Sequence, residues 1–531
     1  MEPEGSLVAA YVANDRIGRD SLGLMKFFVI SAIFSALAFS QPPGAGRGAT
    51  PAATPTAPVA DKPLVEEPPI VTKHQIHANG KTLSYTATAG MMPIKNAQGE
   101  IEANLFYVSY VLDGTTDYSK RPLLVAFNGG PGSASVWLHM GCIGPKRVKM
   151  MDDGALPAAP YQLVDNDNTW LDQADLVFVD PVGTGYSRAQ NQTLQHKFNS
   201  LEGDVQSVGE FIRLFLTRNE RWASPLFLAG ESYGTTRAAG LSGYLVENGI
   251  AFNGVILLST VLNFETILFS HGNDLPYMLY LPSYAATAFY HKKLPPELQK
   301  SLEVTLKEAE RLAVGAYNEA LAKGDQLTDA DYKSIVAKVA RITGVDQKYV
   351  DNSDLRMELM HYLRELLRDQ KLMAGRLDSR LTGPAPLNTS EMAEFDPSMT
   401  AIRPPYTAMF NQYVHAELGY KTDMTYYVLG GGILGWDYGE QNKNRYVDVS
   451  DSLRSAFAKN PHMKVFVGCG YYDMATPYFA AEYTFSHMGL HPSVRKNVVF
   501  QYYTAGHMFY IDVASHKKLK NDITQFMKSA N

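Results

Sequence analysis

The feature that most constrains this fold is a set of short, nearly continuous apolar runs. Six of them occupy residues 122–127, 175–180, 226–230, 254–259, 464–468 and 497–503. Strands that are buried on both faces have this pattern, as they do in parallel sheets. Between the runs lie helical patterns such as residues 201–219, in which apolar side chains recur at helical spacing. The sequence therefore predicts an α/β fold in which helices cover a mostly parallel central sheet.

The chain just before these runs has a different pattern. Around Asn79-Gly80, apolar and polar residues alternate in places, and Asn-Gly is the strongest short-range signal for a β-hairpin. Residues 101–112 form another strand-like run. We therefore expect the sheet to begin with antiparallel strands.

The long interval between the fourth and fifth apolar runs, residues 266–440, has a mainly helical pattern. Thr328 is expected to cap the start of one helix that ends at Gly344, and Ser353 is expected to cap the start of the next. This block would interrupt the core as a cap and divide it into residues 63–265 and residues 441–531. Such insertions often form lids over active sites. A helical ornament remote from the site is the alternative.

The third apolar run ends in Gly230-Glu231-Ser232-Tyr233-Gly234, and a helix-forming run follows it. A G-x-S-x-G pattern can arise by chance, so its context decides its meaning. A serine at a sharp strand-to-helix turn projects its hydroxyl above the strand end. Flanking glycines are needed there because the turn is strained and crowded. This context predicts that Ser232 is the nucleophile of an α/β-hydrolase fold.

A serine hydroxyl needs a general base, and the base needs a carboxylate that orients it. In an α/β-hydrolase fold these residues follow one another as serine, acid and histidine. Asp473 and His507 follow the last two apolar runs, where such residues belong. Asp180 also ends a strand, but it precedes Ser232 in the chain. The order therefore predicts a triad of Ser232, Asp473 and His507.

The oxyanion that develops during acyl transfer needs hydrogen-bond donors that are already in place. One donor is expected to be the backbone N–H of Tyr233, the residue after the nucleophile. The other should come from the loop after the first apolar run, where glycines let the backbone approach a ligand. We expect Gly130 to supply it.

Four motifs together show a family resemblance. They are Asn128-Gly129-Gly130-Pro131-Gly132, residues 180–187, residues 230–234 and residues 505–508. In this order they resemble the serine carboxypeptidases, peptidase family S10, and the likeness spans most of residues 75–525. The resemblance implies an α/β-hydrolase fold with a helical insertion and an enzyme that removes C-terminal residues from peptides. It also implies roles for seven residues: Ser232, Asp473 and His507 as triad, Gly130 and Tyr233 as oxyanion hole, and Asn128 and Glu231 as ligands of the substrate's terminal carboxylate.

The role of Glu231 has a physical consequence. Two carboxylates at hydrogen-bond distance repel each other, so one of them must take up a proton. Glu231 should therefore be protonated when a carboxylate is bound, and peptides should bind more tightly at acidic pH. His507 must be neutral to act as a base, which moves the optimum of turnover upward. The alternative is that Glu231 only braces the turn.

The chain departs from the family pattern at several positions. Ala126, Ser133 and Cys142 stand where many members have tryptophan, cysteine and glutamate, and the proline that follows the histidine motif is absent. The carboxylate-binding network is therefore thinner than usual. These losses are compatible with a bacterial branch of the family.

We expect an exported serine carboxypeptidase that hydrolyses the C-terminal peptide bond through an acyl-enzyme on Ser232. Its expected partners are peptides with a free C-terminus. The main alternative is a serine esterase or acyltransferase that uses the same triad. A non-catalytic peptide-binding protein on the same fold is a further alternative, and a complete triad in order argues against it. The oligomeric state stays open.

The N-terminal segment predicts export. Residues 25–40 start with Met25-Lys26, continue with an apolar stretch and end in small residues, as a signal peptide does. Residues 1–24 are then an extension that precedes the true start, and residues 41–62 are a linker rich in Pro, Ala and Thr. The mature protein would be periplasmic or secreted, without a membrane segment. A retained N-terminal anchor is the alternative.

Charge and cysteine content narrow the possible functions. The 48 Lys and Arg against 54 Asp and Glu give a net charge of −6, so we expect no nucleic-acid partner. The two cysteines, Cys142 and Cys469, exclude a disulfide scaffold, and we expect two free thiols because both lie beside glycine turns. One disulfide between them is the alternative. Gly430, Gly432 and Gly435 have a dinucleotide-type spacing, but no helix pattern follows them. We expect no cofactor and no metal.

Overall fold

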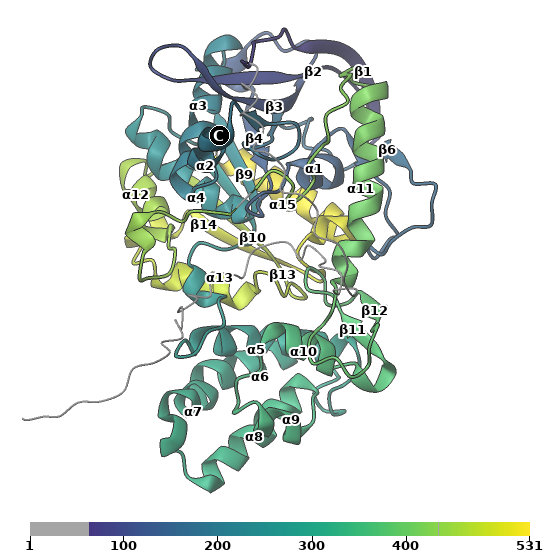
Figure 1. The fold of residues 1–531 in the computed structure, drawn as a ribbon, viewed down its shortest axis with the longest axis vertical. Helices are drawn as coiled ribbons and strands as arrows, with labels where there is room; N and C mark the ends of the chain where they lie inside the picture. Colours follow the sequence, from purple (N-terminus) through teal and green to yellow (C-terminus); the bar gives the residue numbers. More distant parts are fainter. Residues whose placement is uncertain (1–62, 434, 531) are drawn as a thin grey trace, which may run out of the picture. The chain divides into compact units, whose positions relative to one another are not determined.

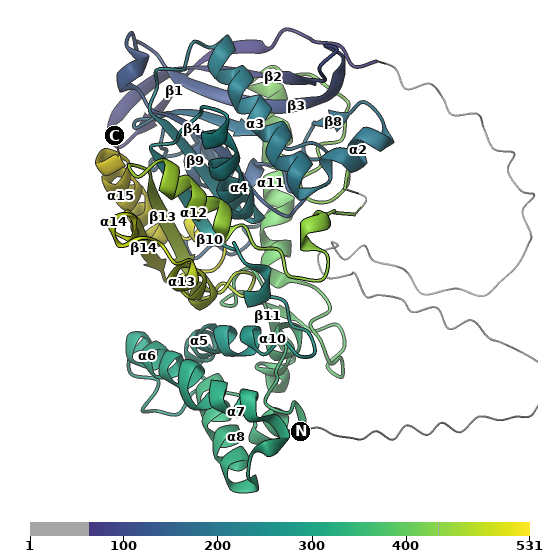
Figure 2. The same ribbon diagram turned by 90° about the vertical axis from the view of Figure 1, so that its left-hand side faces the viewer.

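The structure, a computed structural model, describes residues 63–433 and 435–530, and all of them belong to one compact unit. Its central element is a ten-stranded sheet with the order β1-β2-β3-β7-β4-β9-β10-β13-β14 and with β8 beside β3 (Figures 1 and 2). The strands are β1 (Ile70–Ala78), β2 (Lys81–Lys95), β3 (Ile101–Leu112), β4 (Leu123–Phe127), β7 (Asp175–Val179), β8 (Arg188–Ala189), β9 (Leu226–Ser232), β10 (Gly254–Thr260), β13 (Lys464–Gly470) and β14 (Val498–Tyr503). Two short ribbons lie outside this sheet: β5 (Lys146–Val148) with β6 (Leu163–Asp165), and β11 (Leu372–Ala374) with β12 (Thr382–Pro384).

The six apolar runs all form strands, and these six strands pair with one another in parallel. β4 pairs with β7 and β9, and β10 pairs with β9 and β13, which in turn pairs with β14. Along β10, Val255 and Leu257 lie in one apolar core, and Ile256 and Leu258 lie in another. Both faces of these strands are therefore buried, which explains their lack of polar alternation. The prediction of an α/β fold with a mostly parallel sheet is confirmed.

The antiparallel opening is also present. β1 and β2 pair around Asn79 and Gly80, whose φ values of 50° and 72° suit a tight hairpin turn. β3 is antiparallel to both β2 and β7, so it joins the hairpin to the parallel strands.

Helices cover both faces of the sheet. Side chains of α3, α4 and α12 share one core with β10, whereas side chains of α1, α11 and α15 share the other. Outside the insertion the helices are α1 (Val136–Leu138), α2 (Gln192–Phe198), α3 (Leu201–Arg218), α4 (Tyr233–Glu247), α12 (Ser450–Lys459), α13 (Tyr478–His487), α14 (Pro492–Arg495) and α15 (Val513–Ala530).

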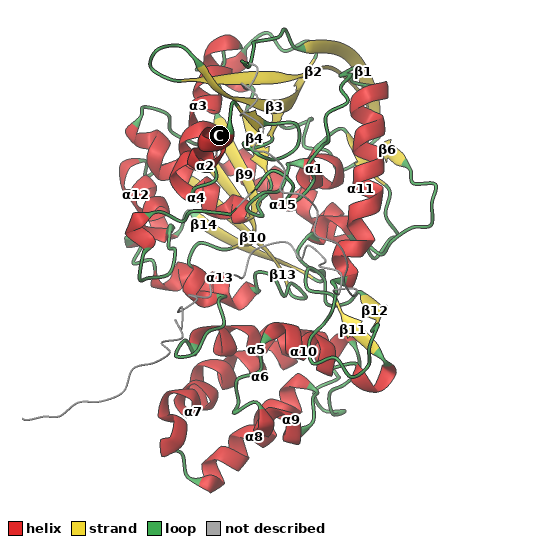
Figure 3. Cartoon of the chain, viewed as in Figure 1, coloured by secondary structure: helices red, strands yellow, loops and turns green. Residues whose placement is uncertain are grey.

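The interval between β10 and α12 is mainly helical, as the sequence predicts (Figure 3). Thr328 caps α8 by accepting a hydrogen bond from the N–H of Asp331, and Gly344 ends this helix with a φ of 74°. The helices are α5 (Leu275–Tyr290), α6 (Leu302–Leu312), α7 (Asn318–Lys323), α8 (Asp329–Thr343), α9 (Gln347–Asn352), α10 (Leu359–Glu365) and α11 (Pro397–Ala416).

The expectation for Ser353 is wrong. Ser353 follows the end of α9, and its hydroxyl donates a hydrogen bond to the carbonyl of Tyr349 at 2.8 Å. Asp354 and Leu355 then take φ values of 46° and 66°, which turn the chain before α10 begins. A serine hydroxyl can serve either end of a helix, and the backbone turn decides which one.

Three further expectations concern the cysteines, membrane-spanning helices and the N-terminal segment. Cys142 and Cys469 are both free thiols and both buried, as expected. Within residues 63–433 and 435–530, no helix is both long enough and apolar enough to cross a membrane. The predicted signal peptide, residues 25–40, lies outside the described residues, as do residues 1–24 and 41–62.

Candidate active site

Ser232 occupies the predicted sharp turn between β9 and α4. Its φ of 60° and ψ of −132° are strained for a residue with a side chain. A Cβ atom on Gly230 would lie 2.2 Å from the carbonyl oxygen of Gly234, and one on Gly129 would lie 2.4 Å from the amide nitrogen of Tyr233. Glycine is therefore required at these positions because the neighbouring backbone leaves no room.

Asp473 and His507 form a direct pair. The Nδ1 atom of His507 lies 2.7 Å from Oδ2 of Asp473. The carboxylate also accepts hydrogen bonds from the backbone N–H groups of Ala475 at 2.7 Å and Thr476 at 2.9 Å, and the Thr476 hydroxyl donates to Oδ2 at 2.8 Å. Asp473 is thus held in place as an acceptor for the Nδ1 proton, which leaves Nε2 of His507 free to act as a base.

The electrostatics of His507 fit this role. Burial lowers the pKa of His507, but the charge and the hydrogen bond of Asp473 outweigh it and raise the pKa above its ordinary value. An imidazolium at this position is therefore stabilised by the carboxylate of Asp473.

Ser232 and His507 lie on opposite sides of the C-terminal end of β10. Ser232 pairs with Thr260 of β10, and the hydroxyl of Ser259 donates a hydrogen bond to the carbonyl of His507 at 2.6 Å. The structure thus brings Asp473 and His507 into contact and places both close to the strand end beside Ser232. A hydrogen bond between Ser232 Oγ and the imidazole stays a prediction.

Glu231 is buried directly beside Ser232. Its Oε1 atom accepts a hydrogen bond from Nδ2 of Asn128 at 2.9 Å, whereas Oε2 is buried without a partner among the described residues. Burial raises the pKa of Glu231 to about 7, although the charge of His507, the Tyr510 hydroxyl and the Asn128 amide each lower it to a smaller extent. Glu231 therefore carries a proton at acidic pH, when its free oxygen can donate to a bound carboxylate.

Asn128 is itself held firmly. Its Oδ1 atom accepts from the N–H of Leu138 at 2.9 Å, and its backbone carbonyl accepts from the buried guanidinium of Arg237 at 2.6 Å. Arg237 in turn pairs with the buried Asp204 at 2.8 Å. Asn128 and Glu231 are therefore fixed as one unit at the N-terminal end of α4.

Two tyrosines near Glu231 could not be predicted from the motifs. The hydroxyls of Tyr406 and Tyr510 are buried and, like Oε2 of Glu231, have no partner among the described residues. A Cβ atom on Gly141 would lie 2.4 Å from the Tyr406 hydroxyl and 2.9 Å from the Tyr510 ring, so the two rings meet at one point. The Tyr510 hydroxyl interacts with Glu231 strongly enough to lower its pKa, yet the two form no hydrogen bond of normal geometry.

These tyrosines lie beside Cys142, one of the departures from the family pattern. The buried thiol of Cys142 has a raised pKa because of burial and, to a smaller extent, the charge of Glu231. The only local signal for the tyrosines was the position of Tyr510, three residues after His507.

The loop that carries Gly130 lies against the start of α4, since Gly129 packs on the amide of Tyr233. Gly130 has a φ of 104°, which favours glycine. Asp180 braces the same loop, because its Oδ1 atom accepts a hydrogen bond from the N–H of Ser135 at 2.8 Å. The assignment of Gly130 and Tyr233 as oxyanion donors stays a prediction.

In the part of the chain that the structure describes, no three His, Cys, Asp or Glu side chains are arranged to hold a metal ion. The glycine-rich segment around Gly430 continues as a loop, and the next α-helix after it is α12. As expected, no α-helix begins directly after these glycines among the residues that the structure describes.

Comparisons with solved structures agree with the fold. Kex1(Δ)p, a prohormone-processing carboxypeptidase from Saccharomyces cerevisiae, aligns with a TM-score of 0.51 and 16% identity over 84% of this chain and 91% of that chain. At this identity the likeness concerns the fold alone, and it identifies an α/β-hydrolase fold.

Sequence comparisons identify the family. Serine carboxypeptidase-like 5 of Arabidopsis thaliana is 32% identical over 137 residues, which are 25% of this chain and 30% of that protein. Pheromone-processing carboxypeptidase KEX1 of Yarrowia lipolytica is 30% identical over 168 residues, which are 28% of this chain and 24% of that protein. The chain thus spans less than a third of the length of these two curated relatives, which come from a plant and a fungus, and the bacterial branch stays a prediction. The pattern of the serine carboxypeptidase family matches residues 79–508. The chain therefore belongs to the serine carboxypeptidase family.

Proposed function

We propose that this protein is a serine carboxypeptidase that removes the C-terminal residue of peptides through an acyl-enzyme on Ser232. The observation that carries this proposal is Glu231, a buried carboxyl group next to the nucleophile with one oxygen unpartnered and a pKa of about 7. A hydrolase that acts on neutral esters gains nothing from such a group. A peptide with a free C-terminus has a carboxylate that can pair with the unpartnered oxygen of Glu231.

In the proposed reaction, Nε2 of His507 takes the proton from Ser232 as its oxygen attacks the carbonyl of the terminal peptide bond. The backbone N–H groups of Gly130 and Tyr233 would then stabilise the oxyanion. His507 returns the proton to the leaving amino acid, and a water molecule hydrolyses the acyl-enzyme by the same route. The carboxyl group of Asp473, paired with Nδ1 of His507, stabilises the imidazolium in both steps.

The terminal carboxylate would bind against Glu231 and Asn128. Because a carboxylate is accepted only by a protonated Glu231, binding of free-acid peptides should weaken as the pH rises through about 7. A peptide with a C-terminal amide can bind without this proton, but it lacks the charge that the site recognises.

The test compares one peptide as its free acid and as its C-terminal amide, with products followed by mass. We expect sequential loss from the C-terminus of the free acid, and a much slower reaction of the amide. Equal rates on both peptides, with rapid hydrolysis of simple esters, would favour a serine esterase. Transfer of the acyl group to an added alcohol or amine in place of water would favour an acyltransferase.

We also propose that the protein is exported, on the basis of the signal-peptide pattern in residues 25–40. N-terminal sequencing of the mature protein should then find a start after the apolar stretch. A mature chain that still begins at Met1 or Met25 would contradict export by cleavage.

A further inference from the structure

We propose that a short segment of the insertion, residues 376–380, positions Asp473 and His507 for catalysis, and that Arg380 fixes this segment. The inference rests on the proposed function only in that His507 acts as the base of Ser232. The segment follows β11 and precedes β12, so it belongs to the insertion and not to the central sheet. It touches no reacting atom and acts through the two loops that carry the pair.

The first set of contacts is made with the loop of His507. The backbone N–H of His507 donates a hydrogen bond to the carbonyl of Leu377 at 2.5 Å, and the N–H of Gly506 donates to Oδ2 of Asp378 at 3.1 Å. The guanidinium of Arg380 donates to the carbonyl of Thr504 at 3.0 Å. The backbone on the N-terminal side of the catalytic imidazole is thus tied to the insertion at three positions.

The second set of contacts is made with the loop of Asp473. The N–H of Ser379 donates to the carbonyl of Tyr472 at 3.0 Å, and the N–H of Met474 donates to the carbonyl of Arg376 at 3.1 Å. These bonds bracket Asp473 on both sides. The same five-residue segment therefore sets the separation of the two loops, and with it the hydrogen bond between Asp473 and His507.

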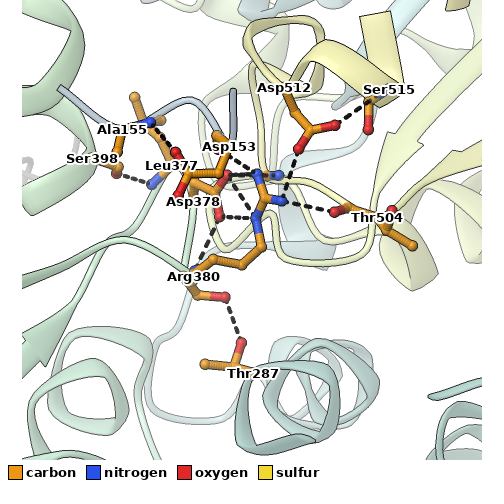
Figure 4. A network of polar contacts seen from close by, with 12 residues as sticks. Asp153, Ala155, Thr287, Leu377, Asp378, Arg380, Ser398, Thr504, Asp512 and Ser515 are labelled. Carbon is orange, nitrogen blue, oxygen red and sulfur yellow. Dashed lines mark hydrogen bonds and ion pairs between the residues drawn. The ribbon is translucent and has the colours of Figure 1, made fainter. Parts of the chain in front are cut away.

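Arg380 holds the segment in its curved path (Figure 4). Its guanidinium binds the carboxylate of Asp378 through Nη2 at 2.7 Å and through Nε at 3.0 Å, and it reaches Asp512 at 3.3 Å and the carbonyl of Asp153 at 3.2 Å. Only 9% of the Arg380 side chain is exposed, so this pairing is shielded from solvent. A planar guanidinium can serve these acceptors at once, whereas an ammonium cannot reproduce the fork.

The segment is also anchored in the insertion itself. The hydroxyl of Ser398 accepts a hydrogen bond from the N–H of Leu377 at 2.9 Å, and the hydroxyls of Ser379 and Thr287 lie 2.6 Å apart. The imidazole of His291, just after α5, lies 2.7 Å from the carbonyl of Ser379. Residues 376–380 thus link α5 and the start of α11 to the catalytic loops, which makes the insertion part of the active-site support.

The test replaces Arg380 by glutamine and by lysine and measures kcat, KM and the rate at which a fluorophosphonate modifies Ser232. Since a misplacement of about 1 Å can cost about 100-fold in rate, we expect R380Q to lower kcat and the labelling rate by about 10- to 100-fold with KM nearly unchanged. R380K should recover part of the loss. In R380Q the contact between Asp473 and His507 should be looser, so Asp473 should raise the pKa of His507 by a smaller amount. The acidic limb of the pH–rate profile should therefore move to lower pH.

A matched control is Arg341, which also joins two carboxylates within the insertion, those of Glu297 and Glu308. R341Q should leave kcat and the labelling rate within about twofold of the unchanged protein. If R380Q does not fold, D512N removes one of the two carboxylate partners of Arg380 and should give a smaller loss of the same kind.

The proposal is overturned if R380Q, folded by circular dichroism, labels at the rate of the unchanged protein. It is also overturned if the loss in R380Q leaves the pH profile unmoved and is matched by R341Q. Fluorophosphonate labelling needs no peptide substrate, so a failure of the carboxypeptidase assignment would leave this readout intact.

Discussion

The two sides of the candidate active site are built in different ways. Ser232 is held by backbone crowding, since a Cβ atom on Gly230 or on Gly129 would collide with the backbone of Gly234 or of Tyr233. The pair of Asp473 and His507 is held by hydrogen bonds from a distant insertion, such as the bond between Gly506 and Asp378, which are 128 positions apart. Ser232 therefore depends on the steric fit of the backbone around it, and His507 depends on polar contacts with the insertion.

The two sides of the site therefore tolerate different substitutions. The turn at Ser232 tolerates no change at its glycines, because any added carbon collides with rigid backbone. The support of His507 includes the side chains of Asp378 and Arg380, and a substitution of either one weakens hydrogen bonds without a steric collision. We therefore expect substitutions of the glycines at the turn of Ser232 to lower the free energy of unfolding. Substitutions in the polar support of His507 should instead lower the reaction rate.

The largest expected effect is the loss of either reacting residue. S232A and H507A should each lower kcat by at least about 10⁴-fold, and the double variant should be no worse than the single ones because the two side chains act as one unit. In S232A, which leaves the buried pair of Asp473 and His507 intact, the free energy of unfolding should change by less than about 1 kcal/mol. Additive losses in the double variant would show that the two sides act separately.

Crowding at the turn should give the largest effect on stability. G230A places a carbon 2.2 Å from the carbonyl oxygen of Gly234 and should lower the free energy of unfolding by roughly 3–5 kcal/mol, measured in urea. Gly249 is the control for backbone strain without crowding, because it has a φ of 81° and open space around its Cα, whereas Gly230 is crowded and has no positive φ. G249A should cost only about 1 kcal/mol. A cost of G230A no larger than that of G249A would contradict crowding as the constraint on the turn.

Glu231 connects the two sides, since it neighbours Ser232 in the chain and senses the charge of His507. Its folded-state pKa of about 7 lies above the unfolded value of 4.5, so its contribution to stability is complete below pH 4.5 and is lost as the pH rises through about 7. The loss amounts to about 3 kcal/mol. E231Q stays neutral and keeps the acceptor for Asn128, so this pH-dependent loss should disappear from urea titrations at pH 4.5 and 8. An unchanged pH dependence would contradict a raised pKa.

The smallest effect is expected at Tyr510. Y510F removes a buried hydroxyl beside Glu231 and should raise KM for free-acid peptides by about threefold to tenfold, with little change for the amide. Tyr85 offers a control, because its hydroxyl is also buried and has no hydrogen-bond partner in the described part of the chain, but this residue lies on β2. Equal effects of Y510F and Y85F would assign the Tyr510 hydroxyl a purely structural role.

Local patterns made much of the molecule predictable. The apolar runs located the parallel strands because both faces of those strands are buried, and Asn79-Gly80 located the hairpin because few other residues accept its backbone angles. The turn at Ser232 was predictable for the same reason: Gly230 must leave room for the carbonyl of Gly234, a steric requirement that lies within five residues.

Contacts between distant segments were not predictable. Ser353 carried a helix-start signal, but the turn at Asp354 and Leu355 assigned it to the end of α9. Tyr406 and Arg380 have no motif of their own, because their roles depend on which loops the fold brings beside them. The polar support of His507 became visible only once the insertion and the catalytic loops were seen together.

Ser232 and the pair of Asp473 and His507 are held in different ways, and we expect both to act on one hydroxyl, that of Ser232. Labelling of the active-site serine measures this joint action directly. The folded protein is treated with a fluorophosphonate, and the modified residue is mapped by mass spectrometry. We expect a single adduct on Ser232, which H507A should lose and E231Q should retain. A folded protein that takes no adduct at Ser232, or an H507A variant that is labelled as fast as the unchanged protein, would contradict it.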